Sequence, residues 1–123
     1  MQKQIKAWIY CRVREGGSRI LLDYQAAALE DYALKNNMNI VGVIKEISEG
    51  KWLDSFKMNF LINAIRKKEI NIVLVYCPSR ISIYRDIVDE FEMFCHVHHV
   101  QLISIKEYMR ECEELCVSNN RQN

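Results

Sequence analysis

The run of residues from Ile70 to Tyr76 is nearly continuous in apolar side chains and stops at Pro78. A strand has this composition when both of its faces are covered, which is typical of parallel sheets flanked by helices. Parallel neighbours cannot be joined by tight hairpins and need long crossover connections, which are usually helical. This run therefore favours an α/β domain built around a parallel sheet.

The rest of the chain alternates between short apolar runs and longer stretches of helical period, which predicts βαβ units with right-handed crossovers. The predicted strands are residues 7–11, 40–44, 70–76 and 100–105. The apolar residues that mark the predicted helices are Leu22, Ala26, Leu29 and Ala33, then Phe56, Phe60, Ala64 and Ile65, then Ile87, Phe91 and Phe94. We predict a three-layer α/β domain with a central, mainly parallel four-stranded sheet flanked by helices.

The length of 123 residues is that of one domain. We assign residues 1–106 to this domain and residues 107–117 to a final helix with Tyr108, Cys112 and Leu115 on one face. This helix either packs on the domain or mediates dimerisation. The polar residues 118–123 are expected to form a disordered tail.

Net charge, the N-terminal residues and the cysteines indicate which partners and which cellular compartment to expect. The formal net charge is +1, so any contact with nucleic acid depends on a local cluster of basic residues. No signal peptide is expected, because residues 1–6 are polar and the apolar run after them is short. No apolar stretch approaches the roughly 20 residues of a membrane span. We therefore expect a cytoplasmic protein whose five cysteines are free thiols, mostly packed as small apolar residues.

Arginines cluster in the loops that should meet at one edge of the sheet. Ligand and reaction sites of parallel sheets lie at the carboxyl ends of the strands, so the loops after Cys11, Lys45 and Cys77 are the candidates. These loops bring together Arg12, Arg14, Arg80 and, further along, Arg85. Guanidinium groups suit phosphate because they donate paired hydrogen bonds to it. The alternative is a set of separate surface arginines that pair with nearby acidic residues: Glu15, Glu46 and Asp86.

Four short motifs follow one another along the chain at the strand ends and on the first helix. They are Tyr10-Cys11-Arg12-Val13 followed by Arg14, then Leu22-Asp23-Tyr24-Gln25, then Glu46 with Glu49-Gly50 and Asp54-Ser55, then Ser79-Arg80-Ile81-Ser82-Ile83. In this order they resemble the catalytic domain of the serine recombinases, the resolvase/invertase family, over residues 6–105. The resemblance implies the fold of that domain.

The resemblance also implies a chemistry that this chain has lost. In the family a serine hydroxyl attacks a DNA phosphodiester and forms a phosphoserine bond, and arginines stabilise the transition state without a metal or nucleotide cofactor. The nucleophile position here is Arg14, and Ser79 replaces the acidic residue before Arg80. Two arginine positions of the family hold Ser55 and Ile83. The resemblance therefore implies a catalytically inactive domain.

The family residues that remain form a predicted remnant pocket: Tyr10, Arg12, Glu46 and Arg80. We expect Arg12, Arg14 and Arg80 to bind phosphates of the DNA backbone. We do not expect the helix-turn-helix or larger DNA-binding region of the family, because few residues follow Cys116. The expected role is that of a modulator or split partner of an active recombinase, in a homodimer or heterodimer. The alternatives are weak or rerouted DNA nicking, and a protein-interaction module that reuses the fold.

Other residues of the same loops have simpler interpretations. Ser18 lies several residues past the nucleophile position and is a weaker alternative nucleophile. Cys11 faces away from Tyr10 and Arg12 in a regular strand, which predicts a core position. Ser82 is expected to cap the helix that follows it. The glycines at positions 16 and 17 lack the pattern of a phosphate-binding loop and are expected to form a hinge.

A cysteine and two histidines, Cys95, His96 and His99, lie within one helical turn or its end. Cys112 and Cys116 are also four residues apart, so a metal site shared between two helices is an alternative. The expected arrangement is a helix end with exposed histidines, since no CxxC pair is present. We predict no metal and no small-molecule cofactor.

Overall fold

The computed structural model describes residues 4–106 and confirms the α/β class. Its elements, in chain order, are β1 (Ile5–Val13), α1 (Arg19–Lys35), β2 (Met38–Ile47), α2 (Phe56–Arg66), β3 (Ile72–Val75), the short 3₁₀ helix η1 (Pro78–Arg80), α3 (Arg85–Val97) and β4 (Gln101–Ser104). The predicted final helix, residues 107–117, and the predicted tail, residues 118–123, lie outside the described residues. No helix in the described part of the chain is long and apolar enough to cross a membrane.

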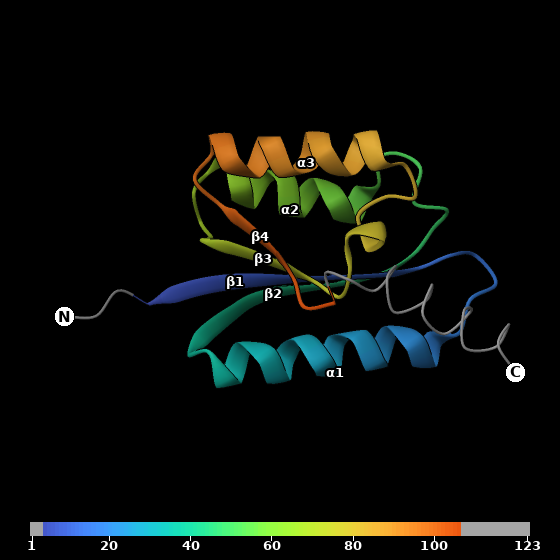
Figure 1. The fold of residues 1–123 in the computed structure, drawn as a ribbon, viewed down its shortest axis with the longest axis horizontal. Helices are drawn as coiled ribbons and strands as arrows, with labels where there is room; N and C mark the ends of the chain where they lie inside the picture. Colours follow the sequence, from blue (N-terminus) through green and yellow to red (C-terminus); the bar gives the residue numbers. More distant parts are fainter. Residues whose placement is uncertain (1–3, 107–123) are drawn as a thin grey trace, which may run out of the picture.

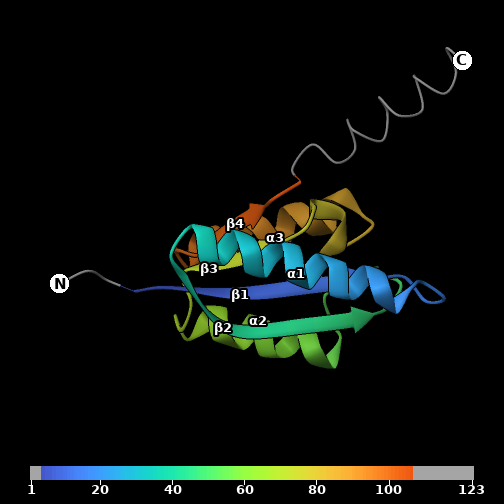
Figure 2. The same cartoon turned by 90° about the horizontal axis from the view of Figure 1, so that it is seen from below.

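The sheet has the strand order β2-β1-β3-β4, and each neighbouring pair is parallel. Figure 2 shows β2 at one edge of the sheet and β4 at the other. In Figure 1, α1 covers one face of the sheet, and α2 and α3 cover the opposite face. This is the predicted three-layer arrangement.

Alternate residues of β1 supply the two halves of the core, because successive side chains of a strand point to opposite faces. Ala7, Ile9 and Cys11 pack in the cluster that contains Leu22 and Leu29 of α1. Tyr10 belongs to the second cluster, with apolar residues of the other two helices: Met58, Leu61, Ala64, Ile65, Phe91 and Cys95. The predicted core positions of Cys11, Leu22 and Leu29 are confirmed, since all three are buried.

Phe56 and Phe60, two of the apolar residues that mark α2 in the sequence, do not face the core. Their side chains are 77% and 54% exposed, whereas Met58 and Leu61 are buried. The two phenylalanines pack edge to face on each other, with ring centroids 5.2 Å apart. The helix carries two apolar stripes, and its buried stripe is the one that continues through Ala64 and Ile65. Helical spacing alone does not distinguish these two stripes.

Candidate functional site

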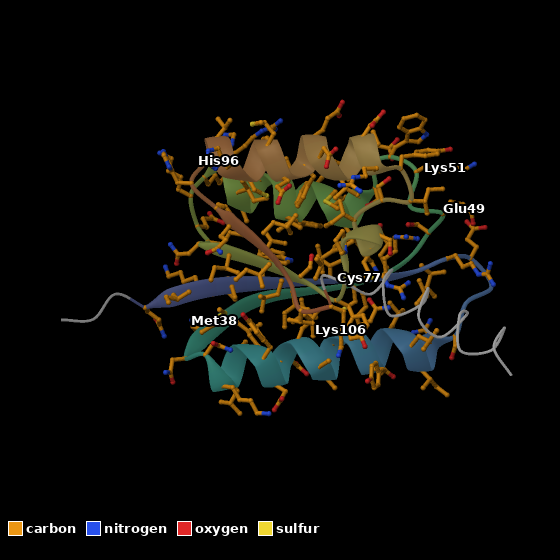
Figure 3. The ribbon with its side chains drawn as sticks, viewed as in Figure 1. Met38, Glu49, Lys51, Cys77, His96 and Lys106 are labelled. Carbon is orange, nitrogen blue, oxygen red and sulfur yellow. The ribbon has the colours of Figure 1, made fainter. Side chains whose placement is uncertain are left out.

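The carboxyl ends of β1, β2 and β3 lie at the same edge of the sheet, because the strands are parallel. In Figure 3 the Glu49 and Lys51 side chains, which follow β2, lie at the opposite end of the molecule from Met38 and His96. We call this region the carboxyl edge; it consists of the loops at residues 14–18, 48–55 and 76–84. These are the loops in which the sequence predicts the site.

Arg12 is a buried residue of β1 whose guanidinium is bound by the protein itself. Its side chain is 3% exposed. Nε donates to the carbonyl oxygen of Arg80 at 3.0 Å, and Nη2 donates to that of Ser79 at 2.7 Å. Nη1 donates to the carbonyl oxygen of Ser48 at 2.9 Å. Burial lowers the pKa of Arg12, and the three carbonyl acceptors favour its charged form. Arg12 therefore joins the loops that follow β2 and β3.

Gly50 allows this arrangement by lying directly against the Arg12 guanidinium. A Cβ atom at position 50 would lie 2.3 Å from Arg12 Cζ, too close for any side chain. The backbone of Gly50 also has φ +71°, in the left-handed region that favours glycine. The Glu49-Gly50 turn of the sequence motif therefore closes over Arg12.

Gln25 of α1 holds the backbone of Arg12 from the other side. Its Nε2 donates to the Arg12 carbonyl oxygen at 3.1 Å, and its Oε1 accepts from the Arg12 amide at 3.2 Å. The sequence placed Gln25 in a family motif without giving it a role. The sequence did contain a sign of this role. Gln25 lies beside Leu22 and Leu29 on the apolar stripe of α1, and a buried polar side chain usually has a hydrogen-bond partner.

Arg80 has unused hydrogen-bonding capacity. Its Nε is buried and has no partner among the described residues. Its Nη1 lies 3.4 Å from the Arg12 carbonyl oxygen, which is long for a hydrogen bond. A guanidinium group has five N–H donors, and those of Arg80 make no other hydrogen bond among the described residues.

Arg14 follows β1 and is exposed, and its side chain has no hydrogen bond or ion pair within residues 4–106. Its carbonyl oxygen accepts from the Gly17 amide at 2.9 Å. Gly16 has φ +79°, so the segment predicted as a hinge forms a tight turn. Arg85, the most distant of the predicted arginines, opens α3 and is exposed as well.

The carboxylate of Glu46 is buried among hydroxyl groups rather than paired with an arginine. Tyr10 Oη donates to Glu46 Oε2 at 2.9 Å, and Ser55 Oγ donates to Oε1 at 2.7 Å. Ser48 Oγ lies 3.3 Å from Oε2. Burial and the neighbouring Glu46 charge raise the pKa of Tyr10, which keeps its hydroxyl protonated as a donor. The four predicted pocket residues thus form two hydrogen-bonded pairs. Tyr10 bonds to Glu46, and Arg12 bonds to Arg80.

The two positions that the sequence assigns to missing arginines are occupied differently. Ser55 is the N-cap of α2, where its Oγ accepts from the Met58 amide at 3.0 Å. Ile83 is exposed, and its amide donates to the Gly50 carbonyl oxygen at 2.8 Å. Neither position supplies a positive charge to the carboxyl edge.

The prediction that Ser82 caps α3 is wrong. The N-cap of α3 is Tyr84, which makes no side-chain capping bond. Ser82 is buried, and its Oγ donates to the Gly50 carbonyl oxygen at 2.7 Å and accepts from the Tyr84 amide at 3.1 Å. The Ser82 hydroxyl therefore joins the loop after β2 to the segment before α3, and α3 begins at Arg85.

Two other residues that could act as nucleophiles are placed in structural positions. Ser18 is the N-cap of α1, and its Oγ accepts from the Ile20 amide at 3.1 Å. Cys11 is buried against α1, and burial raises the pKa of its thiol to about 12. A thiol with such a pKa is a poor nucleophile near neutral pH.

The residues described contain no group of three or more histidine, cysteine, aspartate or glutamate side chains that could hold a metal ion. Cys95 is buried, and burial raises the pKa of its thiol to about 12. His99 follows the end of α3 with φ +61°. Cys112 and Cys116, the other half of the alternative metal site, lie outside the described residues.

Residues 7–116 match the family model described as the N-terminal domain of resolvases. The fold is similar to the catalytic domain of ISC1926 TnpA, an IS607-like serine recombinase, with a TM-score of 0.76 and 21% identity over 90% of this chain and 77% of that one. The N-terminal catalytic domain of TP901-1 integrase matches with a TM-score of 0.70 and 29% identity, over 81% of this chain and 76% of that one. A resolvase family site-specific recombinase from Streptococcus pneumoniae matches with a TM-score of 0.67 and 23% identity, over 98% and 90%. Among curated proteins, none matches the chain significantly.

Proposed function

We propose that this chain, which belongs to the resolvase family of serine recombinases, binds DNA phosphates at its carboxyl edge and does not cleave DNA. The binding pocket consists of Arg12, Arg14 and Arg80, with the buried Tyr10–Glu46 pair beside it. Arg80 and Arg14 supply the donors, and Arg12 holds the loop that carries Arg80.

The single observation that carries this proposal is the incompletely satisfied guanidinium of Arg80, whose one hydrogen bond among the described residues is the 3.4 Å contact with the Arg12 carbonyl oxygen. A buried donor without an acceptor costs about 1–3 kcal/mol, and Arg80 Nε is such a donor. A phosphate oxygen supplies acceptors in the geometry that a guanidinium prefers. Arg14, which is exposed on the adjacent loop, adds a second positive charge.

The loss of the serine at the family's nucleophile position supports the inactive part of the proposal. The residue after Val13, where the family motif has serine, is Arg14. Ser18 and Ser55 both use their hydroxyls as helix caps. Loss of one transition-state donor typically reduces a rate by about 10²–10³. Replacement of the nucleophile together with two arginines therefore places the family reaction below detection.

The role that fits these properties is that of a non-cleaving partner in DNA recombination in the cytoplasm. Two of the similar structures are catalytic domains, one from an IS607-like serine recombinase and one from an integrase. A domain that keeps the fold and the phosphate pocket joins an active recombinase in a heterodimer, or a second copy in a homodimer. Such a partner modulates the reaction or supplies one half of a split recombinase.

Two assays test this proposal together. Binding of a labelled DNA duplex is measured by anisotropy at low salt, and supercoiled plasmid is incubated with the protein and examined for nicks and covalent adducts. We expect binding without cleavage. No binding at low salt would overturn the phosphate pocket and favour the protein-interaction module. A covalent adduct on Ser18 or any other residue would overturn the inactive assignment.

A further inference from the structure

Two large aromatic side chains, Trp52 and Tyr84, form an exposed pair at the carboxyl edge. Their ring centroids are 6.0 Å apart with an interplanar angle of 52°. Trp52 is 63% exposed and Tyr84 is 44% exposed. They come from different loops, one following β2 and the other preceding α3. Aromatic side chains of this size bury large apolar areas when they find a partner, and here their faces are left to solvent.

Hydrogen bonds of the Ser82 hydroxyl hold together the two loops that carry this pair. Ser82 Oγ donates to the carbonyl oxygen of Gly50 at 2.7 Å and lies 3.3 Å from that of Lys51. The Tyr84 amide donates to Ser82 Oγ at 3.1 Å. Ser82 thus contacts Lys51, which directly precedes Trp52, and Tyr84 itself. The backbone segments that carry the two rings are therefore joined before any ligand arrives, which lowers the entropic cost of binding.

The same joined loops carry Arg80, whose guanidinium has an Nε without a partner among the described residues. Arg12 donates to the carbonyl oxygens of Arg80 and Ser48, so the arginine and the aromatic pair share two joined loops. Lys51 precedes Trp52 and Arg85 follows Tyr84 in the sequence. Exposed aromatic rings beside basic groups are the features with which proteins bind single-stranded nucleic acid, the rings stacking on bases while the cations bind phosphates.

We propose that the Trp52–Tyr84 pair stacks on an unpaired base of a DNA strand whose phosphate is bound at Arg80. This inference rests on the proposed phosphate pocket and specifies the form of DNA that it takes. Bases within a duplex are already stacked on each other, so the aromatic pair gains nothing from them. The chain therefore binds a single-stranded or melted segment about 10-fold more tightly than a duplex of equal length at the same salt.

The fluorescence of Trp52 reports stacking directly. The protein has two tryptophans, so Trp8→Phe leaves Trp52 as the single indole. An oligothymidine is titrated into this variant, and an abasic oligonucleotide of equal length is titrated as the phosphate-only control. We expect the oligothymidine to quench Trp52 and to bind about 10-fold more tightly than the abasic strand. If Trp8→Phe does not fold, the difference between wild type and Trp52→Phe gives the same signal.

Substitutions separate stacking from phosphate binding. Trp52→Ala should weaken oligothymidine binding about 10-fold and leave abasic binding unchanged, and Phe60→Ala, an exposed aromatic beside β2, should change neither. Equal binding of both oligonucleotides without quenching, still weakened by Arg80→Gln, would overturn the stacking proposal and leave the phosphate pocket intact. Failure of both oligonucleotides to bind at low salt would overturn the two proposals together.

Discussion

The guanidinium groups of Arg12 and Arg80 each lie against the backbone carbonyl oxygen of the other residue. Arg12 Nε donates to the Arg80 carbonyl oxygen at 3.0 Å, while Arg80 Nη1 lies 3.4 Å from the Arg12 carbonyl oxygen. The first guanidinium is occupied by three carbonyl groups, and the second retains a buried Nε without a partner. The two arginines therefore have different roles: one organises the loops, and the other is available to a phosphate.

Substitution of Arg12 should affect folding more than binding. Arg12→Gln removes the cation that three backbone carbonyls contact, and it leaves buried acceptors without donors. We expect the free energy of unfolding to fall by about 2–4 kcal/mol in urea denaturation. The matched control is Arg14→Gln, an exposed arginine two residues away, which should change stability by less than about 0.5 kcal/mol. Equal effects of the two substitutions would show that Arg12 does not organise the loops.

The close approach of Gly50 to Arg12 can be separated from its backbone conformation. Gly50→Ala adds a Cβ that collides with the guanidinium and also strains a backbone with φ +71°. Gly16→Ala imposes a similar strain at φ +79° with no atom within 4 Å of the new Cβ. We expect Gly16→Ala to cost about 1 kcal/mol of unfolding free energy and Gly50→Ala at least about 1 kcal/mol more. Equal costs in urea denaturation would contradict the packing of Gly50 on Arg12.

The buried Tyr10 hydroxyl should make stability sensitive to alkaline pH. Burial and Glu46 raise the pKa of Tyr10 in the folded state above its ordinary value of 10.0, so above pH 10 the unfolded state loses a proton that the folded state keeps. Stability therefore decreases as pH rises, by up to about 1.4 kcal/mol per pH unit for this group. The difference in unfolding free energy between wild type and Tyr10→Phe isolates it, since the cysteines contribute equally to both. A difference independent of pH between 9 and 11 would contradict the burial of this hydroxyl.

Elements and core faces were predictable where one apolar stripe dominates. Leu22, Ala26, Leu29 and Ala33 predict the buried face of α1, and all four are buried. On α2 the choice between two stripes depends on the packing partner, so the pattern that includes Phe56 and Phe60 marks the helix but not its buried face. The loop contacts of Arg12 were not predictable, because its acceptors are backbone carbonyls, which every residue carries. The sequence thus located the carboxyl edge. Only the structure showed that the Arg12 guanidinium is bound by backbone carbonyls, whereas Arg80 keeps an Nε without a partner among the described residues.

Restoring the family residues tests the assignment of Arg14 to the nucleophile position. Arg14→Ser combined with Ser55→Arg and Ile83→Arg should yield nicked plasmid carrying the protein covalently on the new serine. The Ser55 substitution removes the N-cap of α2, so we expect a stability loss of about 1 kcal/mol that must be checked by thermal melting. The same combination with alanine at position 14 is the matched control. Cleavage by that control, or a folded triple variant without adducts, would contradict the assignment.

The salt dependence of DNA binding tests the central claim, that Arg80 binds a DNA phosphate, most directly. The logarithm of the association constant of a short oligothymidine is measured against the logarithm of salt concentration for wild type, Arg80→Gln and Arg66→Gln. Arg66, whose Cζ lies 5.7 Å from the Phe94 ring centroid, is the charge-matched control. We predict that Arg80→Gln weakens binding and reduces the magnitude of the slope by about 1, while Arg66→Gln preserves the wild-type slope. An unchanged slope in Arg80→Gln would contradict the claim.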